Sequence, residues 1–205
     1  MKKQKVVLLG KGRVGKTSIF KRFLQNEFHD NEVTTIQPQY LEKQVKVNTE
    51  KVTLSIWDTA GQERFRGLNP LFYRNSKAAI MVYDITDQES LDSLEDWLAE
   101  LKNQVGHKIV LMIVGNKSDL KKKRQVSIED AENLAKKVGA QHFCVSAKTG
   151  ENIDEMFHEL AKRVMKFVKE NKTPLNTTKS RRNFALVNED VETKKKKKKN
   201  NDGCC

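Results

Sequence analysis

Residues 10–17 carry a glycine-rich pattern that can hold phosphate groups. The pattern reads G-x-x-x-x-G-K-T, with Gly10, Gly15, Lys16 and Thr17 at its fixed positions. Glycines let backbone N–H groups close around phosphate oxygens, and a helix that follows adds the positive end of its dipole. The lysine can reach the β- and γ-phosphates, and the threonine hydroxyl can bind Mg²⁺. We therefore predict a nucleoside triphosphate site that includes Gly12, Arg13, Val14, Gly15, Lys16, Thr17 and Ser18.

A second polar segment, N-K-S-D at residues 116–119, contains residue types that can select a base. The Asp119 carboxylate can accept hydrogen bonds from guanine N1–H and from the 2-amino group. Adenine lacks that pair of donors, so a buried Asp119 would lose its partners. We expect Asn116 to join this loop to the phosphate loop and the Lys117 stem to cover the base. A third contact is expected from Ser146, Ala147 and Lys148, where the Ala147 N–H could hold guanine O6.

A third segment, D-T-A-G-Q-E at residues 58–63, can sense the γ-phosphate. Asp58 ends an alternating apolar run and can hold Mg²⁺ through a water molecule. Gly61 permits close approach of the backbone to a phosphate. Gln62 can orient a water molecule for attack, which makes it the candidate catalytic residue for hydrolysis.

The elements that must position these loops alternate between strand and helix. The three loops follow the apolar runs 6–9, 52–57 and 109–115, and ligands bind at strand ends in an open α/β sheet. Segments 41–48 and 51–57 should form an antiparallel hairpin, whereas βα connections make the other strands parallel. The predicted fold class is α/β, a doubly wound six-stranded, mostly parallel sheet with one antiparallel strand and five helices.

The periodicity also places each element along the chain. We expect Ser127 to cap a helix and Cys144 to be a small core residue of a buried strand. The expected strands lie near 5–10, 41–48, 51–57, 78–84, 108–115 and 141–145, and the expected helices near 16–26, 65–75, 88–105, 127–138 and 151–170.

The net charge is distributed unevenly along the 205 residues. Residues 172–205 hold ten Lys and Arg against four Asp and Glu, a net +6 of the formal +12. This segment has few apolar residues and contains the unbroken run Lys194–Lys199, so it cannot bury enough apolar surface to fold. We expect a guanine-nucleotide-binding domain over 1–171 and a disordered basic tail over 172–205.

Other function classes find little support in the composition. The N-terminus passes directly into a strand pattern without a signal peptide, and no apolar run approaches the ~20 residues that a spanning helix needs. Three cysteines do not suggest a disulfide framework, and the four histidines lack metal-ligand spacing. A cytosolic chain is therefore expected.

In this order and spacing, the motifs resemble those of the Ras superfamily of small GTPases over roughly residues 4–170. The runs 57–65, 72–76 and 82–86 look like the Rab family in particular. Residues 8–18 with 34–37 are most similar to the Rab twenty-one and Rab five group, which is early endosomal. The resemblance implies a monomeric switch that binds GTP or GDP with Mg²⁺, hydrolyses GTP slowly and regulates vesicle trafficking, in the endocytic pathway for this group.

The resemblance also implies residue roles and partners. Thr35 matches the threonine that binds Mg²⁺ and the γ-phosphate, so the metal set is Thr17, Thr35 and Asp58. Phe28 matches the aromatic beside guanine. Tyr40, Trp57 and Phe72 match an effector-facing aromatic set. Expected partners are an exchange factor, a GTPase-activating protein, a dissociation inhibitor or escort protein, and effectors.

The last two residues, Cys204 and Cys205, resemble a doubly geranylgeranylated Rab terminus. Two lipid chains anchor a protein stably, whereas one binds marginally. Lys194–Lys199 would add attraction to an anionic membrane of ~1 kcal/mol per lysine. The expected location is the cytoplasmic face of an intracellular membrane, endosomal for this group, with cycling through the cytosol.

The chain departs from the Rab pattern after the switch threonine, where Rabs usually have Ile-Gly, whereas here Gln37 and then Pro38 follow Ile36. Proline removes a backbone donor and restricts the residue before it, which bears on effector choice. Arg13 stands at a variable position and could point to solvent or touch a phosphate. Gly12 leaves room around Gln62, so hydrolysis is expected.

Two alternatives from other classes stay open. In the first, Gln37 and Pro38 distort the switch and the protein is a nucleotide-bound scaffold with negligible hydrolysis. In the second, the basic tail serves RNA or nuclear transport, which predicts steeply salt-dependent RNA affinity. The terminal cysteines argue against the second alternative, and no nucleic-acid partner is expected.

Overall fold

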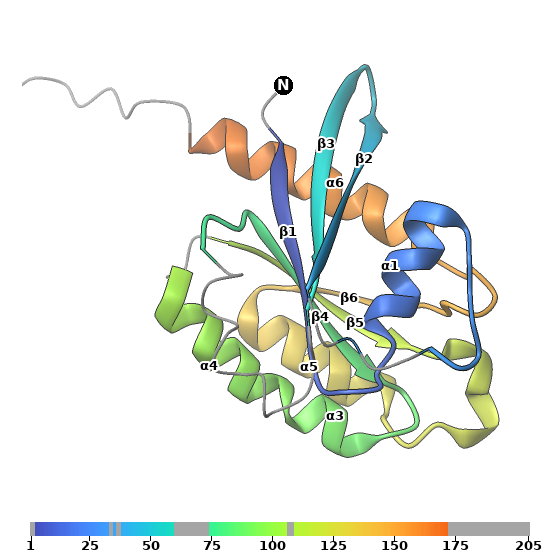
Figure 1. The fold of residues 1–205 in the computed structure, drawn as a ribbon. Coiled ribbons are helices and arrows are strands. Elements are labelled where there is room, and N and C mark those ends of the chain that lie inside the picture. The colour runs from blue at the N-terminus through green and yellow to red at the C-terminus, as the bar shows by residue number, and fades with distance from the viewer. Residues whose placement is uncertain (1–2, 33–34, 36–37, 60–73, 106–108, 172–205) are drawn as a thin grey trace, which may run out of the picture. The chain divides into compact units, whose positions relative to one another are not determined.

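A six-stranded sheet runs through the part of the chain that the structure describes (Figure 1). The structure is a computed structural model, and it describes residues 3–32, 35, 38–59, 74–105 and 109–171. All the described elements fall within the unit Met1–Thr173. The strands are β1 (Gln4–Leu9), β2 (Gln39–Val47), β3 (Glu50–Asp58), β4 (Ala78–Asp84), β5 (Val110–Asn116) and β6 (Gln141–Cys144).

The order of the strands places the carboxyl ends of β1, β4 and β5 along one edge of the sheet. The order is β2-β3-β1-β4-β5-β6, and in this sheet β2 and β3 pair antiparallel while the other pairs are parallel. Strand β3 pairs with β1 on one side, and β4, which comes later in the chain, pairs with β1 on the other side. The order therefore reverses at β1, and ligands bind at such a switch point in open α/β sheets.

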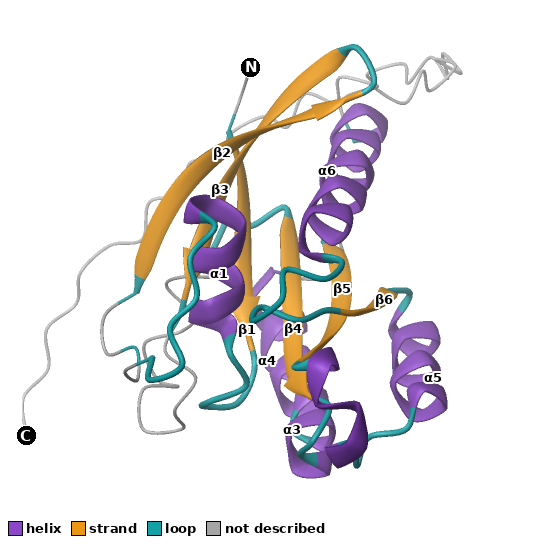
Figure 2. Ribbon diagram, turned by 90° about the vertical axis from the view of Figure 1, so that its right-hand side faces the viewer, coloured by secondary structure: helices purple, strands orange, loops and turns teal. Residues whose placement is uncertain are grey.

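Two layers of helices cover the sheet, as Figure 2 shows for α1 and α6 on one face. Phe23 of α1 stacks on Phe157 of α6 with ring centroids 3.7 Å apart. On the other face, Trp97 and Leu98 pack in the core with Tyr83 of β4. Burying one such side chain stabilises the fold by roughly 1.5–3 kcal/mol. The helices are α1 (Lys16–Gln25), α3 (Gln88–Asp92), α4 (Leu94–Val105), α5 (Ile128–Val138) and α6 (Ile153–Glu170).

Local sequence signals explain where several elements begin and end. The Ser127 side chain accepts a hydrogen bond from the Asp130 N–H at 3.0 Å, which confirms the expected N-cap of α5. The same helix ends at Gly139, whose φ of 69° suits a left-handed C-cap. The hairpin of β2 and β3 is confirmed, and its turn places Asn48 at a φ of 52°. The α/β fold class is therefore confirmed.

Two expectations change, and one element was not expected. The helix expected over 88–105 is two helices separated at Ser93, whose hydroxyl donates to the Ser90 carbonyl at 3.0 Å and so competes with the helical pattern. A 3₁₀ helix, η2 (Ser118–Lys123), was not expected. Cys144 is half-buried and not a core residue, because β6 is an edge strand.

The helix expected over 65–75 falls largely on residues 60–73, which lie outside the described part of the chain. Within the described ranges, none of the helices has both the length and the apolar character that crossing a membrane requires.

Candidate nucleotide-binding site

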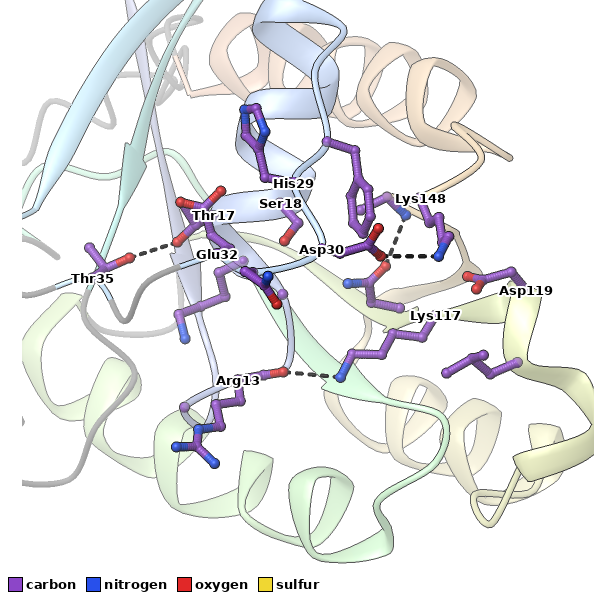
Figure 3. A pocket seen from close by; sticks show the side chains of 18 of the residues that line it. Arg13, Thr17, Ser18, His29, Asp30, Glu32, Thr35, Lys117, Asp119 and Lys148 are labelled. Carbon is purple, nitrogen blue, oxygen red and sulfur yellow. Dashed lines mark hydrogen bonds and ion pairs between the residues drawn. The ribbon is translucent and has the colours of Figure 1, made fainter.

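A cavity of about 800 Å³ opens at the strand ends, between the phosphate loop, the loops after β5 and β6, and residues 28–32 and 35 (Figure 3). It contains side chains predicted for both ends of a nucleotide. Its lining residues are Gly12, Arg13, Gly15, Lys16, Thr17, Ser18, Phe28, His29, Asp30, Asn31, Glu32, Thr35, Thr59, Asn116, Lys117, Asp119, Leu120, Ala147 and Lys148.

The phosphate loop closes around the ammonium of Lys16. Lys16 is only 5% exposed, and its Nζ donates to the carbonyls of Gly10 and Lys11 at 2.9 and 3.0 Å. Burial lowers the pKa of Lys16 to about 8, against the opposing effect of the nearby Asp58 carboxylate. A phosphate in the loop would give this buried cation an anionic partner within direct hydrogen-bonding distance. Arg13, in contrast, is exposed and takes a φ of 66°.

Gly15 allows the loop to lie against the base-binding segment. It is the N-cap of α1 with a φ of 92°, and a Cβ at this position would lie 2.2 Å from Nδ2 of Asn116. Both the dihedral angle and the space require glycine. The contact holds the first turn of α1 beside the cavity, where its N–H groups can meet an anion.

Three oxygen-bearing side chains converge at the phosphate end. Thr17 Oγ1 donates to Asp58 Oδ2 at 2.7 Å, and Thr35 Oγ1 lies 2.7 Å from Thr17 Oγ1. Asp58 is fully buried, and its Oδ1 is without a hydrogen-bond partner among the described residues. Burial raises the pKa of Asp58, and the hydrogen bond from Thr17 opposes that shift. Hydroxyl and carboxylate oxygens suit Mg²⁺, and the orphaned Oδ1 could accept from a metal-bound water, so this set fits that ion.

At the other end, Asn116 joins the phosphate loop to the loop after β6. Its Nδ2 donates to the Val14 carbonyl at 2.9 Å, and its Oδ1 accepts from the Ala147 N–H at 3.1 Å. The expected contact of Asn116 with the phosphate loop is therefore confirmed. The Ala147 N–H, expected to meet guanine O6, already has a partner in Asn116. Asp119 lines the cavity and accepts from the Ser146 hydroxyl at 2.6 Å.

Lys117 spans from its own loop to the phosphate loop, as Figure 3 shows. Its Nζ donates to the Arg13 carbonyl at 3.2 Å and pairs with Asp84 at the end of β4. This anchoring at the tip leaves the apolar stem along the cavity, which suits contact with a flat base. Lys148 lies at the base end of the cavity, where its Nζ bonds to Asp30 at 3.0 Å and lies 5.9 Å from the centroid of the Phe28 ring.

Sequence reasoning missed several residues that position the site. Asp84 lies at the carboxyl end of β4. Because ligands bind at strand ends in an open α/β sheet, it could have been identified in the same way as the other loops. Glu32 pairs with Lys21 at 2.7 Å beside the cavity, a contact between α1 and an irregular segment that no periodic pattern reveals. Arg22 contacts carbonyl groups only after folding brings distant segments together.

Some predicted residues lie behind the cavity or outside the described ranges. Val14, Asp58 and Ser146 do not line the cavity but contact residues that do. The residues that fall outside the described part of the chain are Gly61, Gln62, Phe72, Cys204 and Cys205.

Two members of the expected effector-facing set lie together on the β2–β3 hairpin. Tyr40 is 53% exposed and stacks on Trp57, with ring centroids 4.8 Å apart. Lys5 lies over the other aromatic ring of the pair, 4.5 Å from the Trp57 centroid. Trp57 is half-buried, so this pair offers a partly exposed aromatic surface.

Comparisons with known proteins agree with this geometry. The sequence model of the Ras family matches residues 5–166. The chain is 42% identical to Ras-related protein Rab-21 of Mus musculus over 201 residues, which cover 98% of this chain and 90% of that protein. It is 47% identical to Rab-21 of Dictyostelium discoideum over 78% of this chain and 76% of that protein. It is also 40% identical to Rab-30 of Homo sapiens over 82% of each chain.

The family model covers most of the chain, and the alignments with these relatives cover 76–90% of the relatives' length. The cavity brings the phosphate-loop lysine and the N-K-S-D residues to one place, as a nucleotide site of this kind requires. The chain therefore belongs to the Ras family, as a Rab small GTPase that hydrolyses GTP and acts as a switch in vesicle trafficking.

Proposed function

We propose that the cavity binds GTP and GDP with Mg²⁺, with the phosphates at the α1 end and guanine at the end near β5 and β6. The observation that carries the proposal is that one cavity holds Lys16, Thr17 and Thr35 at one end and Lys117 and Asp119 at the other. The proposed nucleotide contacts are Gly12, Arg13, Val14, Gly15, Lys16, Thr17, Ser18, Phe28, Thr35, Gly61, Asn116, Lys117, Asp119, Ser146, Ala147 and Lys148.

At the phosphate end, Thr17 and Thr35 would hold Mg²⁺ through their hydroxyls, and Asp58 through a water. The bound ion supplies neutralisation of phosphate charge. The chain itself contributes the Lys16 ammonium, which lies beside the loop carbonyls and is ready to turn toward phosphate oxygens. Thr17 and Asp58 are already aligned by their 2.7 Å hydrogen bond, so less ordering is needed on binding.

At the base end, selection of guanine rests on a carboxylate held in place. The Ser146 hydroxyl donates to Asp119 Oδ1, so the other carboxylate oxygen and the remaining lone pairs stay available to N1–H and the 2-amino group. An adenine base would not supply the two donors that the rest of this carboxylate can accept, which costs binding energy. Phe28 and the Lys117 stem would lie on either side of the base.

Hydrolysis is assigned to water attack on the γ-phosphate with Gln62 as the orienting residue. The reaction should be slow without an activating protein, because Gln62 alone aligns the water incompletely and no arginine finger is evident in the sequence. Loss of the γ-phosphate would release the contacts of Thr35 and Gly61, so that segments 29–40 and 59–75 change state. Tyr40, Trp57 and Phe72 would then present a different surface to effectors.

We further propose that residues 1–171 form the switch domain and that 172–205 are a tether to an endosomal membrane. Prenyl groups on Cys204 and Cys205 and the charge of Lys194–Lys199 would hold the protein on the cytoplasmic leaflet. A monomeric cycle of this kind requires an exchange factor, a GTPase-activating protein, a dissociation inhibitor or escort protein, and effectors.

The proposal is tested by identifying the nucleotide on the purified full-length chain with Mg²⁺ present, followed by single-turnover hydrolysis. GDP on the purified protein and slow GTP turnover that accelerates with a GTPase-activating protein would support the switch. Tight GTP without turnover, even with the activating protein, would favour a scaffold. Adenine nucleotide, or none, would overturn the assignment of Asp119.

A further inference from the structure

The guanidinium of Arg22 bridges α1 and the loop that follows β6. Its Nε donates to the Ala147 carbonyl at 2.8 Å, and its Nη2 donates to the Lys148 carbonyl at 2.8 Å. A planar fork of donors therefore holds two consecutive carbonyls of one loop. Hydrogen bonds from a charged donor are stronger than those between neutral groups.

Arg22 is itself held in place by the end of its own helix. Its Nη1 donates to the Asn26 carbonyl at 3.1 Å and to Asn26 Oδ1 at 3.0 Å. Asn26 is the left-handed C-cap of α1, and its N–H returns a bond of 3.1 Å to the Arg22 carbonyl. All three guanidinium nitrogens thus have acceptors, which favours this one orientation of the side chain.

The bridge joins the helix whose first turn lines one end of the cavity to the loop that lines the other end. Helix α1 begins with Lys16 and Thr17, which line the phosphate end, while Ala147 and Lys148 line the base end. The loop is attached elsewhere by the bond from the Ala147 N–H to Asn116 Oδ1. Arg22 therefore supplies a further attachment, on the opposite, carbonyl side of the Ala147–Lys148 segment.

We propose that Arg22 is a positioning residue that sets the rate at which guanine nucleotides dissociate. It holds the loop Ser146–Lys148 against α1, so the base contacts and the phosphate contacts keep a fixed separation. Loss of the fork lets the loop move away from α1, which weakens the base contacts and leaves the Mg²⁺ end in place. The inference rests on the proposed assignment of the cavity to a guanine nucleotide.

The test measures dissociation of fluorescently labelled GDP and GTP from full-length wild type, Arg22→Gln and Arg22→Lys. We expect Arg22→Gln to accelerate dissociation of both nucleotides roughly tenfold, about 1.4 kcal/mol, by the same factor because the γ-phosphate is not involved. The dissociation rates of Arg22→Lys should lie between those of wild type and Arg22→Gln, since an ammonium can donate to one or both carbonyls without the planar fork.

A matched control is Arg163→Gln, which removes an arginine of α6 that pairs with Glu159 at 3.9 Å, away from the cavity. It should leave both dissociation rates unchanged. A second readout is the acceleration of GDP release by EDTA, which reports the Mg²⁺ end. EDTA should accelerate GDP release by the same factor in wild type and in Arg22→Gln, whereas general loosening of the fold would reduce that factor.

The outcomes distinguish a failure of the role of Arg22 from a failure of the guanine-nucleotide assignment. If wild type binds guanine nucleotide and Arg22→Gln releases it within twofold of the wild-type rate, the role of Arg22 is wrong while the site assignment stands. The role is also wrong if the EDTA factor drops together with the faster release. If wild type binds no guanine nucleotide, the site assignment fails and the inference fails with it.

Discussion

Lys117 and Asp84 form an ion pair between the ends of two neighbouring strands, β5 and β4. Asp84 is nearly buried, and its other carboxylate oxygen accepts from the N–H and the hydroxyl of Thr86 at 2.9 and 2.8 Å. The carboxylate is therefore held rigidly, and it directs the Lys117 ammonium toward the Arg13 carbonyl. Asp84 thus orients the side chain that is proposed to cover the base.

Replacing Asp84 by asparagine should accelerate GDP dissociation roughly tenfold, because a hydrogen bond between charged groups contributes about 1.5–3 kcal/mol. The control is Thr86→Val, which removes the hydroxyl donor but keeps the carboxylate that faces Lys117. Stopped-flow release of a fluorescent GDP analogue measures the effect. Equal rates in wild type and Asp84→Asn would show that Lys117 needs no partner at this site.

Gly15→Ala should reduce GDP affinity roughly 100-fold, since the strained backbone and the displaced Asn116 amide together cost about 3 kcal/mol. The new Cβ would lie 2.2 Å from Asn116 Nδ2. Gly139→Ala is a matched control, because it also has a positive φ, of 69°, but nothing lies within 4 Å of its Cβ. The control should lose about 1 kcal/mol of stability and keep its GDP affinity. Calorimetric titration measures the GDP affinity of both variants. An unchanged GDP affinity in Gly15→Ala would contradict the close approach of residue 15 to Asn116.

Gln62→Leu should slow single-turnover GTP hydrolysis roughly tenfold or more, because leucine cannot orient the attacking water. GDP dissociation should stay at the wild-type rate, since Gln62 is assigned to the reaction and not to ground-state binding. Hydrolysis is followed by quantifying GTP and GDP at fixed times. A variant that hydrolyses at the wild-type rate would remove Gln62 from the mechanism.

The protein should lose stability as the pH falls below about 6.5, through His142. Burial lowers the pKa of His142 below its usual 6.5, with Glu132 opposing and Arg124 adding to the shift, and its Nε2 lies 2.9 Å from the Tyr83 hydroxyl. The unfolded chain takes up a proton at a higher pH than the folded chain does. The free energy of unfolding therefore declines as the pH falls from 6.5 toward the folded pKa.

Urea unfolding at a series of pH values measures this decline. His142→Asn should flatten it, whereas His158→Asn, which changes an exposed histidine of α6, should not. The same slope in wild type and His142→Asn would assign the pH dependence to other groups.

Replacing both Cys204 and Cys205 by serine should move the protein from the membrane pellet to the supernatant of fractionated cells, because the proposed lipid attachment is lost. Cys144→Ser is the control, since this half-buried thiol lies in β6 and should not affect partitioning. Continued pelleting of the double variant would exclude prenylation as the main anchor.

Much of this architecture was accessible from the sequence because its signals are local. Glycine spacing in residues 10–17 and the apolar run before Asn116 identify loops at strand ends, and the structure brings both to one cavity. The break at Ser93 was missed because a single hydroxyl bonding to the Ser90 carbonyl leaves the apolar period of the two helices intact.

Contacts made by side chains with distant backbone groups leave no such signal. Arg22 occupies a polar position of α1, and its acceptors lie 125 and 126 residues away. The pairing of Lys21 with Glu32 depends on the path of an irregular segment. Such residues become visible only when the loops have been placed in space.

The amide of Asn116 uses its nitrogen toward one loop and its oxygen toward another, and both bonds share one rigid plane. A force that moves the phosphate loop rotates this plane and strains the bond to Ala147, and a force on the Ala147 side acts equally on Val14. The Asn116 side chain therefore couples the position of Val14 to that of Ala147 through a single planar group.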